Sequence, residues 1–125
     1  MASILTVEPK DELKNTIGRR FEDLGYEILT LHNGVEAVEL YRANSKDISL
    51  VLCDYDVPKL DGIETISQIK QINPSSICYL TTDTSNDTDF SNRAYERGAD
   101  LVIFKPLRFE MLYLYFAENL KLNNK

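Results

Sequence analysis

Residues 49–56 read Ser49-Leu50-Val51-Leu52-Cys53-Asp54-Tyr55-Asp56, a short apolar run followed by two aspartates that flank a tyrosine. The run has the length of a β-strand, and its apolar residues do not alternate with polar ones. That pattern is typical of a strand covered on both faces, as in a parallel sheet. We therefore predict that Asp54 and Asp56 lie at the carboxyl end of a buried strand.

Four other apolar runs have a similar length, and a helical segment follows each of the five runs. In these segments apolar residues recur three or four positions apart, which places them on one face of a helix. The first segment is predicted to begin with Asp11 as its N-cap and to end at Gly25. The other runs are residues 4–7, 26–31, 76–81 and 101–104, and the other helical segments are 35–41, 63–72, 87–97 and 109–122.

Five strand-then-helix units in one short chain indicate an α/β fold with helices on both faces of a parallel sheet. Right-handed crossovers then favour a doubly wound five-stranded sheet with the flavodoxin-like order 2-1-3-4-5. The 125 residues, 43% of them hydrophobic, suit a single domain spanning 1–125. In such a sheet, ligands bind at the edge where the strands end.

Composition and charge exclude several functions. The net charge of −6 argues against a nucleic-acid surface, which needs a basic patch. The chain lacks an apolar run long enough for a membrane span and begins without the features of a signal peptide, so we expect a cytoplasmic protein with no membrane contact. Cys53 and Cys78 each lie inside an apolar run, and we interpret them as buried thiols rather than a disulfide.

The predicted carboxyl ends of the strands gather polar residues suited to phosphoryl chemistry. Clustered carboxylates repel one another unless a cation compensates, and Mg²⁺ takes oxygen ligands of this kind. A carboxylate can also attack phosphorus, while a lysine neutralises the phosphoryl oxygens. The candidates are Glu8 after the first strand, Asp54 and Asp56 after the third, Thr81 and Asp83 after the fourth, and Lys105 after the fifth.

Each candidate also has a structural interpretation. Asp54 could cap a turn, although a carboxylate directly after four apolar residues is costly near a buried edge. Thr81 is an ordinary residue for a strand end, and Lys105 alone would be a surface lysine. Asp56 and Asp83 suit turns as well as they suit metal ligands. The functional interpretation rests on all of these residues occurring together at the predicted strand ends.

Several stretches resemble the receiver domains of two-component signalling, over essentially the whole chain. The stretch 52–62, with Asp54, Pro58 and the pair Asp61-Gly62, resembles the phosphorylation loop of that family. Residues 21–27 and 32–37 resemble the approach to the second strand and the opening of the second helix. Residues 98–100 and 104–106 resemble the end of the fifth strand.

The resemblance implies a role for each site residue. Asp54 would accept a phosphoryl group from a histidine kinase or a histidine phosphotransfer protein, making the chain a switch rather than an enzyme with turnover. Lys105 would contact the phosphoryl group, and Thr81 would be the switch hydroxyl. Mg²⁺ would be held by Glu8, Asp54 and the main-chain carbonyl of Asp56. The Lys105–Pro106 bond is expected to be cis, as is usual in such domains.

Two residues depart from the family pattern. The first strand usually ends in two adjacent acidic residues, but here Pro9 follows Glu8. Proline cannot ligate a metal through its side chain, so weaker Mg²⁺ binding is expected unless Glu8 or Asp56 compensates. The fifth strand carries Val102 where the family usually has an aromatic residue, so switching must use backbone or helix shifts instead.

Two alternative functions remain open at this stage. The departures at Pro9 and Val102 would suit a pseudo-receiver that binds partners without phosphorylation. The sequence Asp54-Tyr55-Asp56-Val57 also matches the nucleophile loop of haloacid-dehalogenase-like phosphatases, although that loop normally ends the first strand.

The last predicted helix is more apolar than one buried face requires. Receiver domains commonly dimerise through helix 4, strand 5 and helix 5, and we predict a homodimer contact on this surface that involves Tyr113 and Tyr115.

Overall fold

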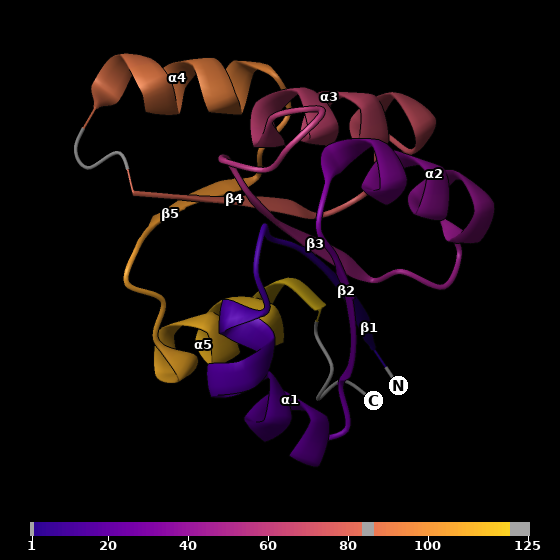
Figure 1. Ribbon diagram of the computed structural model, residues 1–125, viewed down its shortest axis with the longest axis vertical. Coiled ribbons are helices and arrows are strands. Elements are labelled where there is room, and N and C mark those ends of the chain that lie inside the picture. The colour runs from indigo at the N-terminus through magenta and orange to yellow at the C-terminus, as the bar shows by residue number, and fades with distance from the viewer. Residues whose placement is uncertain (1, 84–86, 121–125) are drawn as a thin grey trace.

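The computed structural model describes residues 2–83 and 87–120, which form a three-layer α/β sandwich (Figure 1). All strands are parallel, and they are ordered β2-β1-β3-β4-β5. This confirms the predicted fold and strand order. The strands are β1 (Ser3–Val7), β2 (Glu27–Leu31), β3 (Leu50–Asp54), β4 (Cys78–Thr82) and β5 (Leu101–Phe104).

The helices cover both faces of the sheet. In Figure 1, α2, α3 and α4 lie on one face, and α1 and α5 lie on the other. The predicted first helix contains one π-helical turn, η1 (Lys14–Gly18), which continues directly into α1 (Arg19–Asp23). The others are α2 (Gly34–Asn44), α3 (Gly62–Ile72), α4 (Thr88–Glu96) and α5 (Phe109–Leu120). None of the helices within residues 2–83 and 87–120 is both long and apolar enough to cross a membrane.

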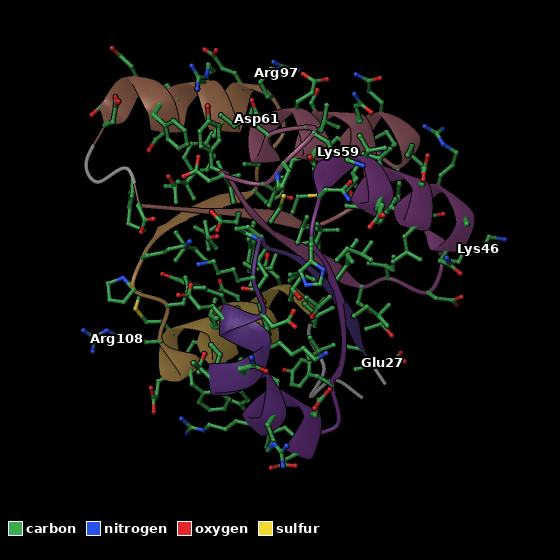
Figure 2. The ribbon with its side chains drawn as sticks, in the orientation of Figure 1. Glu27, Lys46, Lys59, Asp61, Arg97 and Arg108 are labelled. Atoms are coloured by element: carbon green, nitrogen blue, oxygen red, sulfur yellow. The ribbon has the colours of Figure 1, made fainter. Side chains whose placement is uncertain are left out.

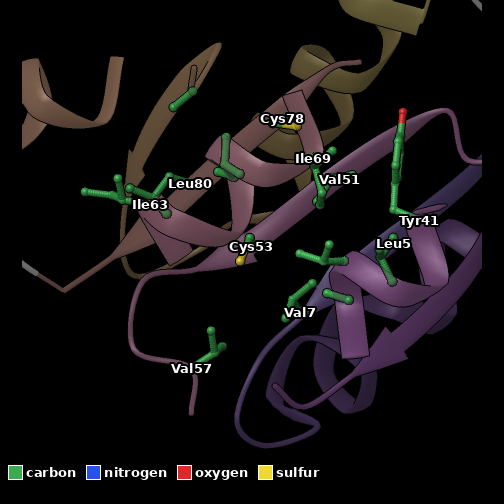
Figure 3. Close-up of a cluster of buried hydrophobic side chains, with 14 of the residues drawn as sticks. Leu5, Val7, Tyr41, Val51, Cys53, Val57, Ile63, Ile69, Cys78 and Leu80 are labelled. Carbon is green, nitrogen blue, oxygen red and sulfur yellow. The ribbon is translucent and has the colours of Figure 1, made fainter. Parts of the chain in front are cut away.

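Successive residues of the central strands are buried on opposite faces, which explains their apolar runs. Val51 and Cys53 of β3 pack with Val7 beneath α2 and α3 (Figure 3). Leu50 and Leu52 pack on the other face in a cluster that also contains Phe21 and Phe116. Cys53 and Cys78 are buried free thiols, as predicted.

Helices α2, α3 and α4, which cover one face of the sheet, each start with a side-chain cap. The side chains of Asn33, Asp61 and Asp87 accept hydrogen bonds from main-chain N–H groups in the first turns of α2, α3 and α4. Asp61 lies in the loop between β3 and α3 (Figure 2). Each cap follows the carboxyl end of a strand, so these three helices begin on the side of the sheet where the candidate site lies.

Candidate functional site

A cavity of about 560 Å³ opens at the carboxyl edge of the sheet. Glu8, Asp54, Thr81 and Lys105 all line it, so the fold brings these predicted site residues together. Asp83 and Glu12 line it as well. Asp56 is not part of the lining; its side chain is exposed, and the role predicted for it uses only the main chain.

Asp54 is held by an ion pair at the end of β3. Its side chain is only 8% exposed, and its Oδ2 accepts a hydrogen bond from Lys105 Nζ at 2.7 Å. The other oxygen, Oδ1, lies 3.4 Å from the main-chain nitrogen of Asp56, which donates to it. A buried carboxylate of this kind needs a cation, and Lys105 is that partner.

Lys105 reaches Asp54 because β5 and the turn after it are fixed against β4. The Lys105 main-chain N–H donates to the Thr82 carbonyl at 2.9 Å, and the Lys105–Pro106 bond is cis, as predicted. Burial would lower the pKa of Lys105. The hydrogen bond and charge of Asp54, together with the charges of Asp83 and Glu12, outweigh burial and raise the Lys105 pKa above its ordinary value.

Thr81 lies directly beside Asp54 in the sheet. The two residues are register partners in β4 and β3, and Thr81 is buried. The Tyr55 main-chain N–H donates to the Thr81 carbonyl at 2.8 Å. The Tyr55 ring meets the Phe90 ring of α4 edge-on, with the two ring centroids 5.0 Å apart. Tyr55 therefore packs between the site and α4.

Glu8 has a structural role that the sequence analysis missed. Its two carboxylate oxygens accept main-chain N–H groups of Leu13 at 3.0 Å and Lys14 at 3.3 Å. Glu8 thus supplies the side-chain cap of the first helix. Asp11 does precede the first helical residue, as predicted, and its carbonyl accepts the Asn15 N–H at 2.8 Å, but its side chain does not cap the helix. The Asp11 side chain instead pairs with His32 Nε2 at 2.7 Å. Glu8 reaches the start of the helix only because the chain folds back after β1. The spacing of residues in the sequence therefore could not reveal this cap.

The pKa of Glu8 is raised, chiefly by burial. The two main-chain N–H groups lower it, while the charges of Asp11 and Glu12 raise it further. A nearby cation would offset this destabilisation of the ionised carboxylate.

The donor set fits a hard divalent cation. The cavity lining contains four carboxylates, those of Glu8, Glu12, Asp54 and Asp83, against the single ammonium of Lys105. Among the described residues no three acidic, histidine or cysteine side chains are grouped closely enough to hold an ion by themselves. Mg²⁺ does not need such a cage, because it commonly uses one or two carboxylates together with water and phosphate oxygens.

The residues around β5 differ from those expected for an aromatic switch. Val102 has no ring, and its main-chain N–H donates to the hydroxyl of Tyr95 from α4 at 3.1 Å. A tyrosine thus contacts this position from the neighbouring helix. The positions of Tyr95 and Val102 in the sequence do not reveal this hydrogen bond.

Comparison with known families gives one match that covers most of the chain. The family model described as "Response regulator receiver domain" matches residues 4–116.

Individual relatives agree with the family match. A cyclic di-GMP phosphodiesterase from Thermotoga maritima is 32% identical over 119 residues, which cover 95% of this chain and 31% of that protein. A receiver domain protein from Clostridium thermocellum superimposes with a TM-score of 0.87 at 25% identity, covering 98% of this chain and 97% of that one. This chain therefore spans less than a third of the Thermotoga relative.

A solved structure with the same fold has a metal in its cleft. The receiver domain of a sensor histidine kinase from Pseudomonas aeruginosa PAO1 was solved with a magnesium ion coordinated in the active site. It superimposes with a TM-score of 0.84 at 20% identity over 96% of this chain and 98% of that one, a likeness that establishes the fold alone.

Proposed function

The chain belongs to the response regulator receiver family, and from that premise we propose that Asp54 is its phospho-acceptor. The observation that carries this proposal is the buried Asp54 carboxylate, which is paired with Lys105 at 2.7 Å beside Thr81. The phosphoryl donor would be the phosphohistidine of a histidine kinase or a histidine phosphotransfer protein. Residues 1–125 would act as one receiver unit in the cytoplasm.

The transfer needs a nucleophile and positive charge around the phosphoryl group. A carboxylate oxygen of Asp54 attacks phosphorus, so that an O–P bond forms as the P–N bond to the histidine breaks. The released imidazole nitrogen takes a proton from solvent. The Lys105 ammonium orients the carboxylate beforehand and then stabilises the charge on the phosphoryl oxygens.

Glu8, Asp54 and the main-chain carbonyl of Asp56 would hold Mg²⁺. The ion would supply further charge neutralisation for the phosphoryl oxygens. The excess of carboxylates over ammonium groups in the cavity lining supports a cation there.

Thr81 and Tyr55 would carry the signal away from Asp54. The Thr81 hydroxyl donates to a phosphoryl oxygen, which draws the end of β4 toward Asp54. Tyr55 is bonded to the Thr81 carbonyl and packs on Phe90, so this movement reaches α4 without an aromatic residue at Val102. The resulting partner surface comprises α4, β5 and α5, through which a homodimer would form.

Labelling with a small phosphodonor such as acetyl phosphate tests the proposed acceptor. Intact-mass spectrometry should show one added phosphoryl group with Mg²⁺ and little with EDTA. Asp54→Asn should remove the addition, while Asp47→Asn, a surface change with the same charge effect, should retain it. A wild-type protein that stays unlabelled under all conditions would instead favour the pseudo-receiver. Sustained release of phosphate from a phosphomonoester would favour a phosphatase.

A further inference from the structure

Pro9 leaves the candidate metal site one carboxylate short of the usual pair. Glu8 cannot fully make up the deficit, since both of its oxygens already accept main-chain N–H groups of Leu13 and Lys14. A carboxylate has lone pairs for additional bonds, but those hydrogen bonds fix its orientation toward the helix start. The other acidic side chains that line the cavity, and could supply the missing carboxylate, are Glu12 and Asp83.

We infer that Glu12 supplies this carboxylate, so that Glu12 and Asp54 together bind the divalent cation while Glu8 positions the turn that carries Glu12. The inference rests on the proposed function, because it concerns the same cation. It also assigns Glu8 a positioning role in addition to that of a ligand.

Glu12 has the location that this role requires. It lines the cavity together with Asp54 and Lys105. It directly precedes Leu13, whose main-chain N–H donates to Glu8 at 3.0 Å, so Glu12 also lies beside Glu8. Within the described residues the Glu12 carboxylate makes no hydrogen bond or ion pair, so it can bind a ligand without breaking an existing contact.

The main chain around Glu12 is fixed on both sides. Glu8 holds the next two N–H groups, those of Leu13 and Lys14, and the Thr16 hydroxyl donates to the Glu12 carbonyl at 2.7 Å. The Asp11 side chain is bonded to His32 after β2. The turn is therefore anchored to β1 through Glu8 and to the end of β2 through Asp11. The Glu12 side chain takes part in neither anchor, and it lines the cavity.

Asp83 is the other lining carboxylate that could serve, and it offers a matched comparison. It follows β4, whereas Glu12 directly precedes Leu13, whose main-chain N–H donates to Glu8 at 3.0 Å. A ligand that replaces Pro9 should lie near both Asp54 and Glu8, and this requirement favours Glu12.

Titration of the full chain with Mg²⁺, followed by calorimetry and by the amide chemical shifts of residues 54–56, tests the inference. We expect Glu12→Gln to weaken Mg²⁺ binding by about ten- to a hundredfold, the range found for changes around metal sites. Asp83→Asn should weaken it much less. Glu22→Gln on α1, which removes the same charge outside the cavity, should leave it unchanged. Adding Pro9→Asp to Glu12→Gln should restore the affinity. Urea unfolding without metal checks that each variant is folded.

The outcomes separate this inference from the proposed function. Equal Mg²⁺ affinity in wild type and Glu12→Gln, with Asp54 still labelled in a Mg²⁺-dependent manner, overturns the inference alone. Equal losses in Glu12→Gln and Asp83→Asn also overturn it, because they would indicate a general charge effect. A wild-type protein that neither binds Mg²⁺ nor accepts a phosphoryl group overturns both.

Discussion

At the scale of single residues, the site depends on one buried ion pair. Asp54 loses most of its hydration, and Lys105 is the only described basic side chain that pairs with it. Removing one member of such a pair costs more than the pair itself contributes, because the other charge stays buried without a partner. The effects of substitutions at Asp54 and Lys105 should therefore be strongly coupled.

Lys105→Gln should lower the free energy of unfolding by about 1–3 kcal/mol in the absence of Mg²⁺, since it leaves the Asp54 carboxylate unpaired. The loss should lie toward the lower end, because Lys105 remains partly exposed. Urea denaturation measures it. Combining Lys105→Gln with Asp54→Asn should recover part of the stability, and purely additive effects would contradict the proposed coupling.

Gly62 is a second residue on which the site depends, because the backbone approaches it closely. A Cβ at Gly62 would lie 2.5 Å from the Asp54 carbonyl oxygen and 2.8 Å from the Tyr55 Cα. These are main-chain atoms at the end of β3, so they cannot move aside without displacing Asp54.

We expect Gly62→Ala to destabilise the protein by about 1–3 kcal/mol and to slow labelling of Asp54. Gly18→Ala is the matched control, because its Cβ would meet nothing closer than 3.4 Å and alanine favours a helix. Urea unfolding and intact-mass kinetics report the two effects. An unchanged Gly62→Ala protein would show that the loop accommodates a methyl group.

At the scale of elements, an exposed ion pair joins the end of α4 to the first turn of α3. Glu64 in the first turn of α3 accepts a hydrogen bond from Arg97, which directly follows α4. Arg97 and then Gln68 lower the pKa of Glu64 through hydrogen bonds. A carboxylate with a lowered folded-state pKa stabilises the protein above its ordinary pKa, and that stabilisation is lost as the pH falls through the folded-state value.

Glu64→Gln should therefore destabilise the protein slightly near neutral pH, by less than about 1 kcal/mol for an exposed pair. The difference from wild type should shrink as the pH drops below the ordinary Glu64 pKa of 4.5. Urea unfolding across this range measures the difference. Arg97→Gln should give the same trend, and a pH-independent difference would show that the ion pair is not its source.

The sequence predicted the strands well and the contacts between elements less well. The runs in β1 and β3 are apolar because both faces are buried, and this requirement is visible in local composition. The Glu8 cap and the Tyr95–Val102 hydrogen bond join residues that come together only in the assembled sheet.

The tyrosines of α5 illustrate the same limit: the Tyr115 ring meets Tyr79 edge-on, whereas the Tyr113 ring stacks on Phe109. Their apolar character was evident, but their packing partners were not.

At the scale of the whole molecule, the two hydrophobic clusters leave several large apolar side chains on the outside. Met111 and Leu114 of α5 and Tyr95 of α4 are all at least two-fifths exposed. They occur on the helices of the predicted α4–β5–α5 surface. The homodimer on this surface remains a prediction.

Sedimentation with Mg²⁺ and a beryllium fluoride phosphoryl mimic should show an average mass that rises with protein concentration. Leu114→Asp should weaken this association, because it places a charge in the predicted interface. Leu24→Asp is the matched control, since Leu24 is similarly exposed but lies beside α1. A wild-type mass that stays monomeric at every concentration, with and without the mimic, would contradict the dimer.

The Tyr95–Val102 hydrogen bond also has a consequence for solubility at high concentration. β5 is an outer strand of the sheet, and unpaired N–H groups on such a strand can recruit strands from other molecules into aggregates. The Val102 N–H instead donates to the Tyr95 hydroxyl at 3.1 Å. Replacing Tyr95 with phenylalanine would remove the acceptor of this hydrogen bond while keeping the ring. We therefore expect that variant to aggregate more readily at high concentration than the wild-type protein.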